Sequence, residues 1–483
     1  MTNRSSLSHL SATLALCLLA VAVRAGTAGG AGPSQPNILV ILVDDLGYAD
    51  LSCQGSRDVK TPHIDALAAQ GLRCTDGYVT APQCSPSRAG LLTGMNQSRF
   101  GYQENSNHRG LPARRIVEIL PEQMKKAGLT TAIIGKWHLG EKEGKGLSWD
   151  YLLGSAPWER GFDLCVLISK GMSHYLPYSV AGMKWMTEHD QSFWLVEKTS
   201  ADTAPRPLKD LPADTYLTDY FSNRAGEFIR EHREQPWFLY LSYNAPHVPM
   251  TPLESDLVAN AGIKDPLRQK FAALMTGLDR RVGRVMAALN ETGQRDRTLV
   301  WFISDNGGPT HANASRNDPF PGHKGDTWEG GIRVPFLVSW PDRIPAGRTF
   351  DPMISSLDVL PTSLAAVGET NLAPIHEGKN LLPWLTGRST GEAHDALFWH
   401  WRNRIAARVG SLKENRNGPA EHSQSKKAPI LPEHFFVDFA TNPTEDPARP
   451  LADKIKQAQV TSALDAWLEK LQVDARQLTP NHE

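Results

Sequence analysis

The sequence predicts an α/β fold, in which a large mixed, mostly parallel β-sheet is sandwiched by helices and is followed by a smaller C-terminal α+β domain built on an antiparallel sheet. Short apolar runs rich in Val, Ile, Leu and aromatic residues alternate with helix-like stretches, which is typical of buried parallel strands with helices on both faces. The chain has 483 residues, enough for one large core and an appended smaller domain.

Five runs are too short and too apolar to be exposed helices, and we expect each to be a strand of the large sheet. Helices are expected between them. One opens at Thr61-Pro62 and stops at Gly71, and another covers residues 266–289, where apolar residues recur at helical spacing. The predicted strands are residues 38–43, 131–134, 237–243, 299–304 and 334–340.

The residue pattern of the chain changes after about residue 390, so we expect a large α/β domain over residues 36–390 and a C-terminal α+β domain over residues 391–483. Short apolar runs at 397–399 and 435–439 flank a basic, polar stretch, of which residues 413–427 are predicted to form a mobile loop available to substrate. A helix over residues 461–471 closes the domain. Its apolar face is Leu464, Trp467, Leu468 and Leu471.

The N-terminus has the pattern of an export signal. Arg4 lies in a short polar start, an apolar run covers residues 10–23, and small residues follow, which predicts a signal peptide over residues 1–25 with cleavage near Ala25. The run is shorter than the roughly 20 residues of a membrane-spanning helix. Residues 26–35 form a flexible lead. We therefore expect an exported protein, periplasmic or secreted, with no membrane span in the mature chain.

Composition limits the partners and the cysteine chemistry. The formal net charge is −1, which gives no overall field to recruit nucleic acid or anionic membrane. Of the five cysteines, Cys17 falls in the predicted signal peptide, and Cys53, Cys74, Cys84 and Cys165 lack the spacing of a disulfide scaffold or a zinc site. At most one disulfide is expected.

Polar side chains follow four of the predicted strands. Ligands bind beyond the carboxyl ends of strands in open α/β sheets, so we expect these side chains to share one site. Two of the pairs carry the hard oxygen ligands that suit calcium or magnesium rather than zinc or copper. A single such pair more often caps a helix or turn, but two at strand ends favour a metal. The residues are Asp44 and Asp45, Lys136 with His138, Asn244 leading to His247, and Asp305 with Asn306.

The most specific segment runs from Cys84 to Gly94 and reads Cys-Ser-Pro-Ser-Arg-Ala-Gly-Leu-Leu-Thr-Gly. Pro86 suits the first turn of a helix, with Cys84 just before it. The positive end of that helix and the nearby Arg88 favour an anion at this place. Taken by itself, Cys84 is equally consistent with a buried structural thiol or a nucleophilic thiolate.

This segment resembles the signature of the sulfatase family, Cys-x-Pro-Ser-Arg followed by Leu-Thr-Gly, at which that family oxidises the cysteine to formylglycine. The resemblance implies a formylglycine-dependent, arylsulfatase-like enzyme with the alkaline phosphatase superfamily fold. It extends in order and spacing over most of the mature chain. The matching segments are Pro36-Asn37, Asp44-Asp45, Gly135-Lys136-Trp137-His138, Asn244-Ala245-Pro246-His247, Ser304-Asp305-Asn306-Gly307, Gly322-His323-Lys324 and Arg333.

The resemblance implies hydrolysis of sulfate monoesters to an alcohol and inorganic sulfate, through a covalent sulfate on formylglycine. A formylglycine-generating enzyme would modify Cys84 during maturation. His247, with Lys324 as partner, is the candidate acid for the leaving alcohol, and His138 the group that removes a proton when the aldehyde reforms. The implied ligands of calcium, with magnesium as the alternative, are Asp44, Asp45, Asp305, Asn306 and modified Cys84. The implied sulfate contacts are Arg88, Lys136, His138, His247, Lys324 and Ser173.

Two other functions are consistent with the same residues. A phosphonate or phosphate ester hydrolase of the same superfamily would use similar cations, and a non-catalytic binder of sulfated glycans would leave Cys84 unmodified. Taken singly, each lysine or histidine is more often a solvated charge or a satisfied side chain, but the complete set in the expected order favours the sulfatase. A sulfated carbohydrate is the preferred substrate. We expect specificity in loops 99–114, 141–160 and 308–321.

Overall fold

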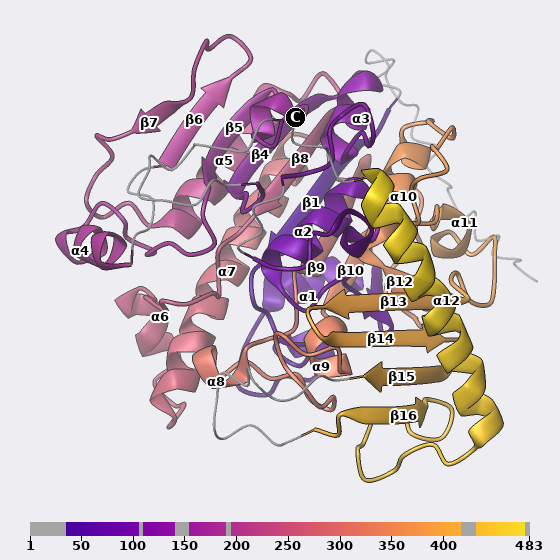
Figure 1. Ribbon diagram of the computed structural model, residues 1–483. Coiled ribbons are helices and arrows are strands. Elements are labelled where there is room, and N and C mark those ends of the chain that lie inside the picture. The colour runs from indigo at the N-terminus through magenta and orange to yellow at the C-terminus, as the bar shows by residue number, and fades with distance from the viewer. Residues whose placement is uncertain (1–34, 106–109, 141–153, 190–194, 417–430, 479–483) are drawn as a thin grey trace, which may run out of the picture.

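A large sheet of ten strands forms the centre of the chain (Figure 1). The computed structural model describes residues 35–105, 110–140, 154–189, 195–416 and 431–478, so the predicted signal peptide and nearly all of the lead lie outside the described residues. In spatial order the strands are β11 (Arg348–Phe350), β2 (Leu72–Cys74), β10 (Phe336–Ser339), β9 (Thr298–Ser304), β1 (Asn37–Val43), β8 (Trp237–Ser242), β4 (Thr130–Lys136), β5 (Leu164–Ile168), β6 (Leu195–Thr199) and β7 (Arg206–Leu208).

The central part of this sheet is parallel. Strands β9, β1, β8, β4 and β5 run the same way, whereas β10 and β6 are antiparallel to their neighbours. All five predicted strands are present as β1, β4, β8, β9 and β10, with small differences at their ends. The expectation of a mixed, mostly parallel sheet is confirmed. A separate two-stranded sheet pairs β12 (Ile354–Ser355) with β3 (Gly77–Tyr78).

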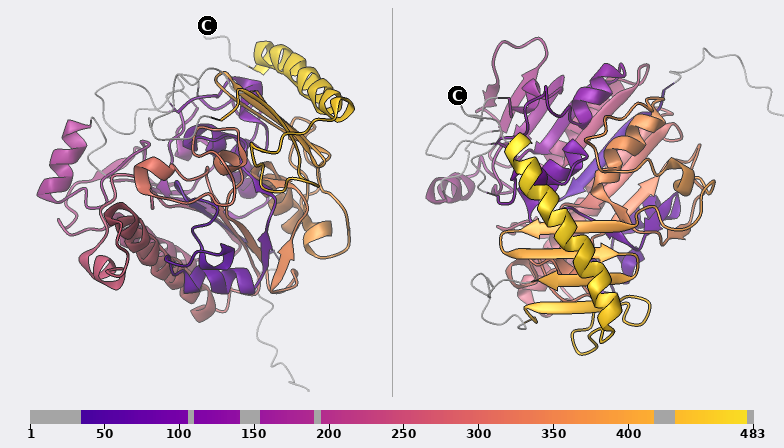
Figure 2. Two further views of the ribbon diagram at one scale, coloured as in Figure 1. Left: turned by 90° about the horizontal axis from the view of Figure 1, so that it is seen from below. Right: turned by 45° about the vertical axis from the view of Figure 1, so that its right-hand side comes forward.

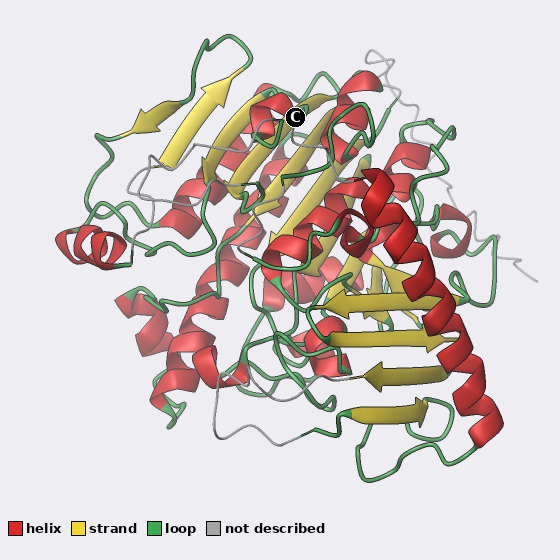
Figure 3. Cartoon of the chain, viewed as in Figure 1, coloured by secondary structure: helices red, strands yellow, loops and turns green. Residues whose placement is uncertain are grey.

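Helices cover both faces of the large sheet (Figure 3). Every residue of β1 is buried, because alternate side chains enter two different cores. Ile38, Val40 and Leu42 pack with α2 (Cys84–Thr93), α3 (Leu120–Lys126) and α10 (Val359–Ala366). The intervening residues pack with α1 (Pro62–Ala69), α5 (Leu217–Glu231) and α7 (Pro266–Glu291). The two helices predicted between the strands of the large sheet are present as α1 and α7.

Shorter helices lie in the connections between these elements. The α-helices among them are α4 (Val180–Glu188), α6 (Glu254–Ala259), α8 (Thr310–Asn313), α9 (Glu329–Ile332) and α11 (Leu382–Leu385). The 3₁₀ turns are η1 (Ser52–Gln54), η2 (Gln97–Phe100), η3 (Pro157–Glu159) and η4 (Ser356–Asp358). No helix in the described ranges is long and apolar enough to cross a membrane. Cys53, Cys74, Cys84 and Cys165 are free thiols there.

A second, antiparallel sheet forms the C-terminal part of the fold, with one long helix lying across it (Figure 2). We call it the C-terminal sheet. Its strands, in order, are β13 (Ala396–Trp401), β14 (Arg404–Val409), β15 (Leu412–Arg416) and β16 (His434–Asp438). The helix is α12 (Lys454–Leu478), which contains the predicted segment 461–471 and buries Leu464, Trp467 and Leu471 against the sheet. The expected antiparallel sheet with a closing helix is confirmed.

The prediction of a mobile loop over residues 413–427 is wrong for its first part. Residues 413–416 belong to β15, and Lys413, Glu414 and Asn415 are each 0% exposed. Burial of the charge on Lys413 is tolerated because its ammonium lies 2.8 Å from carboxylate oxygens of both Glu329 and Glu445. Residues 417–427 lie outside the described residues.

Candidate active site

Cys84 lies at the beginning of helix α2. The helix begins at Cys84 itself, one residue earlier than the sequence predicted, and all ten of its residues are buried. The positive end of the helix dipole therefore points to the thiol. Close packing fixes the helix: a side chain at Gly90 would place its first carbon 2.2 Å from the hydroxyl oxygen of Thr80. Only glycine fits there, so the position of Cys84 is set by the packing of its helix.

Two carboxylates at the end of β1 face Cys84. The Cys84 Sγ lies 3.4 Å from Asp44 Oδ1. Asp45 has a φ of +69°, an uncommon conformation that Asp tolerates better than most residues, and it turns the chain directly after the strand. One ligand atom from each of Asp44, Asp45, Cys84 and His247 lies within 4.8 Å of the others. We call these four residues the Cys84 cluster.

Asp305 and Asn306, at the end of β9, lie beside this cluster. One carboxylate oxygen of Asp305 accepts a hydrogen bond from the backbone N–H of Asp45 at 3.2 Å. Asn306 donates its side-chain amide to Asp45 Oδ1 at 2.7 Å. The amide oxygen of Asn306 is buried and has no hydrogen-bond partner in the described part of the chain. Buried polar atoms are rarely left unpaired, so this oxygen is suited to a cation.

Two buried cations, Arg88 and Lys136, and the partly buried Lys324 surround the carboxylates. Lys136 donates to Asp44 Oδ2 at 2.6 Å, and Lys324 donates to Asp45 Oδ1 at 2.6 Å and to Cys84 Sγ at 3.0 Å. Arg88, one turn along α2, holds Asp305 Oδ2 through two nitrogens at 2.7 and 3.0 Å. Each carboxylate of the site thus has its own cation.

The charges of the site decide which groups are ionised. Burial alone would raise the pKa of Asp44, but the charges of Lys136 and His247 outweigh burial and hold it below its usual value. Burial is likewise outweighed at Asp45, whose pKa is lowered mainly by Lys324. Burial raises the pKa of the Cys84 thiol. The carboxylates are therefore charged and Cys84 is a neutral thiol, unlike the thiolate of a cysteine nucleophile.

The two predicted catalytic histidines lie in different settings. His138 follows β4 with a φ of +56°, its backbone N–H bonds to Ser169 O at 2.8 Å, and its Nδ1 has no partner among the described residues. His247 donates from Nδ1 to the carbonyl of Val248 at 2.6 Å, which leaves Nε2 facing Asp45 Oδ2 at 3.5 Å. Burial lowers the pKa of both imidazoles.

Ser173 is not joined to the cluster by any contact between described residues. Its hydroxyl lies 3.3 Å from the carbonyl of His174 and 3.9 Å from the sulfur of Met186, so its role in sulfate binding stays a prediction. The segment that carries Ser173 does approach the site, because a β-carbon placed on Gly171 would lie 2.7 Å from the His138 ring.

Ser242 was not predicted from the sequence, and Asn244 was named there only beside His247. Ser242, the last residue of β8, accepts a hydrogen bond from Arg88 at 2.5 Å. The feature of the sequence that could have identified Ser242 is its polar side chain at the end of an apolar run. Asn244 is 2% exposed, and neither its amide nitrogen nor its amide oxygen has a partner in the described ranges. The sequence marked it only as leading to His247.

The fold and the Cys84 cluster define an α/β protein with a group of metal-type ligands and cations at the carboxyl edge of its large sheet. A family model described as Sulfatase matches residues 36–369, more than half of the chain. The chain therefore belongs to the sulfatase family and is a sulfuric ester hydrolase.

Relatives and solved structures agree with this assignment. N-acetylgalactosamine-6-sulfatase of Canis lupus familiaris is 28% identical over 92% of this chain and 90% of the relative. Steryl-sulfatase of Mus musculus is 31% identical over 82% of this chain and 72% of the relative. The crystal structure of Ps i-CgsB matches with a TM-score of 0.77 and 29% identity, covering 93% of this chain and 95% of that chain, and its complex with k-i-k-neocarrahexaose with a TM-score of 0.75.

Proposed function

We propose that this chain is an exported sulfatase that removes sulfate from a sulfated carbohydrate, using formylglycine made from Cys84 and a bound calcium ion. The observation that carries the proposal is the setting of Cys84. A neutral thiol at a helix N-terminus lies 3.4 Å from Asp44 and 3.0 Å from Lys324, beside carboxylates that already have cations. Such a thiol is a poor nucleophile, whereas the same position suits a modified side chain that faces an anion.

The residues present fit a calcium ion. Asp44 and Asp45 of the cluster, Asp305 beside Asp45 and the unpaired amide oxygen of Asn306 supply oxygen ligands, the donor set that Ca²⁺ prefers. The charges of Asp44, Asp45 and Asp305 are matched by Arg88, Lys136 and Lys324, so a divalent ion would make the site positive and attractive to a sulfate ester. We propose Asp44, Asp45, Asp305, Asn306 and modified Cys84 as its ligands.

When present, calcium would polarise the sulfate and formylglycine would provide a hydroxyl nucleophile. Charge stabilisation and proton transfer depend on side chains of the chain itself. Arg88, Lys136 and Lys324 bring donors to negative charge that develops on sulfate oxygens. His247, whose Nε2 lies 3.5 Å from Asp45 Oδ2, and Lys324 are proposed to give a proton to the leaving oxygen. His138, whose Nδ1 is unpaired among the described residues, is proposed to accept a proton when the aldehyde reforms. Ser173 stays a proposed sulfate contact.

The carbohydrate substrate is proposed from the relatives and from the predicted signal peptide. One relative is named for the 6-sulfate of N-acetylgalactosamine, and Ps i-CgsB is solved with a carrageenan-type hexasaccharide. An exported enzyme meets sulfated polysaccharides outside the cell.

Turnover of paired esters tests the proposed function. Enzyme from a host that forms formylglycine is compared on sulfate and phosphate monoesters of one phenol, and on N-acetylgalactosamine 6-sulfate and k-i-k-neocarrahexaose. We expect faster turnover of the sulfate than of the phosphate, and release of sulfate from at least one saccharide. Faster turnover of the phosphate would contradict the sulfatase, and turnover of the aryl sulfate without either saccharide would contradict these carbohydrate substrates.

A further inference from the structure

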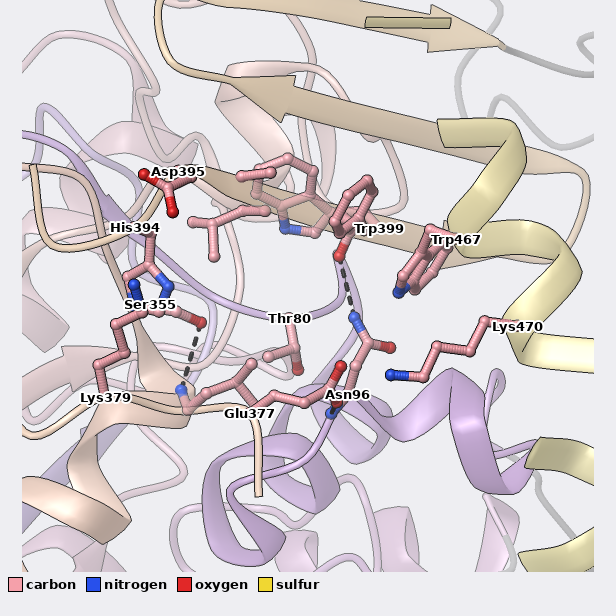
Figure 4. A pocket seen from close by; sticks show the side chains of 14 residues that line it. Thr80, Asn96, Ser355, Glu377, Lys379, His394, Asp395, Trp399, Trp467 and Lys470 are labelled. Carbon is pink, nitrogen blue, oxygen red and sulfur yellow. Dashed lines mark hydrogen bonds between the residues drawn. The ribbon is translucent and has the colours of Figure 1, made fainter. Parts of the chain in front are cut away.

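A cavity of about 310 Å³ lies between the large-sheet part of the fold and the C-terminal sheet, away from the proposed active site (Figure 4). Its size is at the lower end of the range of small-ligand sites, roughly 300 to 1,000 Å³. Strand β13 and helix α12 form one side, and Thr80, Asn96 and residues 377–379 form the other. None of the proposed catalytic or metal-binding residues lines it.

Helix α2 separates this cavity from the active site. Cys84 is the first residue of the helix, and Asn96, which lines the cavity, follows its last residue Thr93 closely. A helix of ten residues is about 15 Å long, at 1.5 Å per residue. The cavity is therefore a separate site at the other end of the helix and not an extension of the catalytic pocket.

Two lysine side chains in the cavity that have no partner among the described residues favour the binding of an anion. Lys379 and Lys470 lie at opposite sides of it (Figure 4), and neither ammonium has an ion-pair or hydrogen-bond partner within the described ranges. The carboxylate of Glu377 is already engaged, since it accepts the Asn96 backbone N–H at 2.6 Å and lies 3.5 Å from Arg99. The exposed Asp395 is the remaining acid of the lining, so cations predominate among the free charges.

The wall formed by the C-terminal part is apolar. The ring of Trp467 stacks on Phe398, with centroids 5.1 Å apart and an interplanar angle of 8°, and Leu397 and Trp399 continue the wall. His394 adds a polar group whose Nε2 is held by Asp358 at 2.8 Å. Inorganic sulfate would use the lysines but not this wall. A sugar ring bearing sulfate would use both, because aromatic side chains pack on apolar faces and leave polar groups to fix orientation.

We propose that this cavity is a secondary, non-catalytic binding site for a sulfated saccharide unit. The inference rests on the proposed carbohydrate substrate, because a polymer that presents sulfated units to the active site presents the same units here. A polysaccharide bound both at the active site and in this cavity would bind more tightly than one bound at a single site, because the second binding event is intramolecular.

The test uses the Cys84→Ala chain, which cannot consume the ligand, with and without the double change Lys379→Ala and Lys470→Ala. Both lysines are exposed, so the fold should be retained. Lys454→Ala is the matched control, because Lys454 is exposed on the same helix and its ammonium donates a hydrogen bond to Gln457. Titration calorimetry follows N-acetylgalactosamine 6-sulfate, k-i-k-neocarrahexaose and sodium sulfate.

We expect N-acetylgalactosamine 6-sulfate to bind at two sites in the Cys84→Ala parent and in the Lys454→Ala control, and at one site in the double variant. We expect k-i-k-neocarrahexaose to bind the double variant at least fivefold more weakly than it binds the parent. Sodium sulfate should show a smaller loss of binding than the saccharides, because it can contact the lysines but not the apolar wall. Equal saccharide binding in all three chains, or equal loss of sodium sulfate binding, would overturn the inference. Hydrolysis by the unmutated enzyme separates the two proposals: if it cleaves a small aryl sulfate while the double variant binds saccharides normally, only the secondary site fails.

Discussion

The environment of Cys84 distinguishes it from the other buried cysteines of the chain. Burial raises the pKa of Cys74 and Cys165 as it does that of Cys84, but both are packed in an apolar core. Cys84 instead lies within 3.4 Å of Asp44 and 3.0 Å of Lys324. A structural thiol gains nothing from such polar neighbours, so the surroundings favour a functional role.

Replacing Cys84 by alanine should abolish sulfate ester hydrolysis, by at least about a thousandfold, and leave the fold intact. The reason is that alanine cannot be converted to formylglycine, whereas the loss of one sulfur atom changes the packing little. Turnover of an aryl sulfate and the circular dichroism spectrum measure the two effects. Cys165→Ala, in the apolar core, is the control and should retain activity. Full turnover by purified Cys84→Ala would refute the mechanism.

Replacing Asn306 by alanine should weaken calcium binding about tenfold or more, because it removes an oxygen that is otherwise unpaired. Asp305→Ala should weaken metal binding and lower activity as well. It should also lower the free energy of unfolding by about 3–5 kcal/mol, because the buried Arg88 loses the carboxylate of Asp305 as its ion-pair partner. The rise in melting temperature on adding calcium measures affinity. An unchanged calcium response in both variants would exclude this metal site.

Among the elements, strand β14 of the C-terminal sheet supports the turn that carries Lys324. Arg404 donates to the carbonyl of Gly325 at 2.8 Å and pairs with the carboxylate of Asp326. Asp326 in turn accepts the backbone N–H of His323 at 3.0 Å. The turn that presents Lys324 to Cys84 is therefore held by a residue from outside the large sheet.

Arg404→Ala should lower kcat about tenfold with a smaller effect on KM, because Lys324 would lose its fixed position while remaining in the chain. Arg404→Lys should restore part of the loss. Steady-state kinetics with a small aryl sulfate measure both. The control is Arg402→Ala, since Arg402 is exposed on the same hairpin, where its guanidinium pairs with Glu104 and lies over the Trp401 ring. Equal kinetics in the Arg404 and Arg402 variants would show that the contact does not position Lys324.

In the molecule as a whole, a buried charge network joins the C-terminal sheet to the large-sheet part. Lys413 of β15 lies between Glu329 and Glu445, at 2.8 Å from each. Burial raises the pKa of Glu445 to about 7, whereas Lys413 and Arg333 outweigh burial at Glu329 and lower its pKa to about 2. The single lysine is thus shared unequally, and Glu445 keeps its proton in the folded state at mildly acid pH.

This network predicts how stability depends on pH. Between pH 4.5 and 7 folded Glu445 holds a proton that the unfolded chain has released, so its contribution to the free energy of unfolding should fall as pH rises through this window. Glu445→Gln should make the slope shallower, by a few kcal/mol at most over the window. Urea unfolding at several pH values measures it, with the exposed Glu469→Gln as control. A slope equal to that of the unmutated chain would contradict the raised pKa.

Much of the fold was predictable because continuous apolar runs such as that of β1 have few alternatives to a buried parallel strand. The Cys84 segment was predictable because its residue order is specific. Strand β15 was not, since the partners of Lys413 are Glu329 and Glu445, far away in the sequence. The cavity beside the C-terminal sheet was not predictable either, because Lys470 is brought to the cavity that Lys379 lines by the packing of α12.

The mass of the tryptic peptide from Cys74 to Arg88, taken from protein made in a host that forms formylglycine, tests the central claim most directly. The account predicts that the sulfur of Cys84 is replaced by an aldehyde oxygen, while the sulfur of Cys74 in the same peptide remains as an internal control. A peptide with both thiols intact, from a host shown to modify another sulfatase, would contradict the account and favour a non-catalytic binder of sulfated glycans.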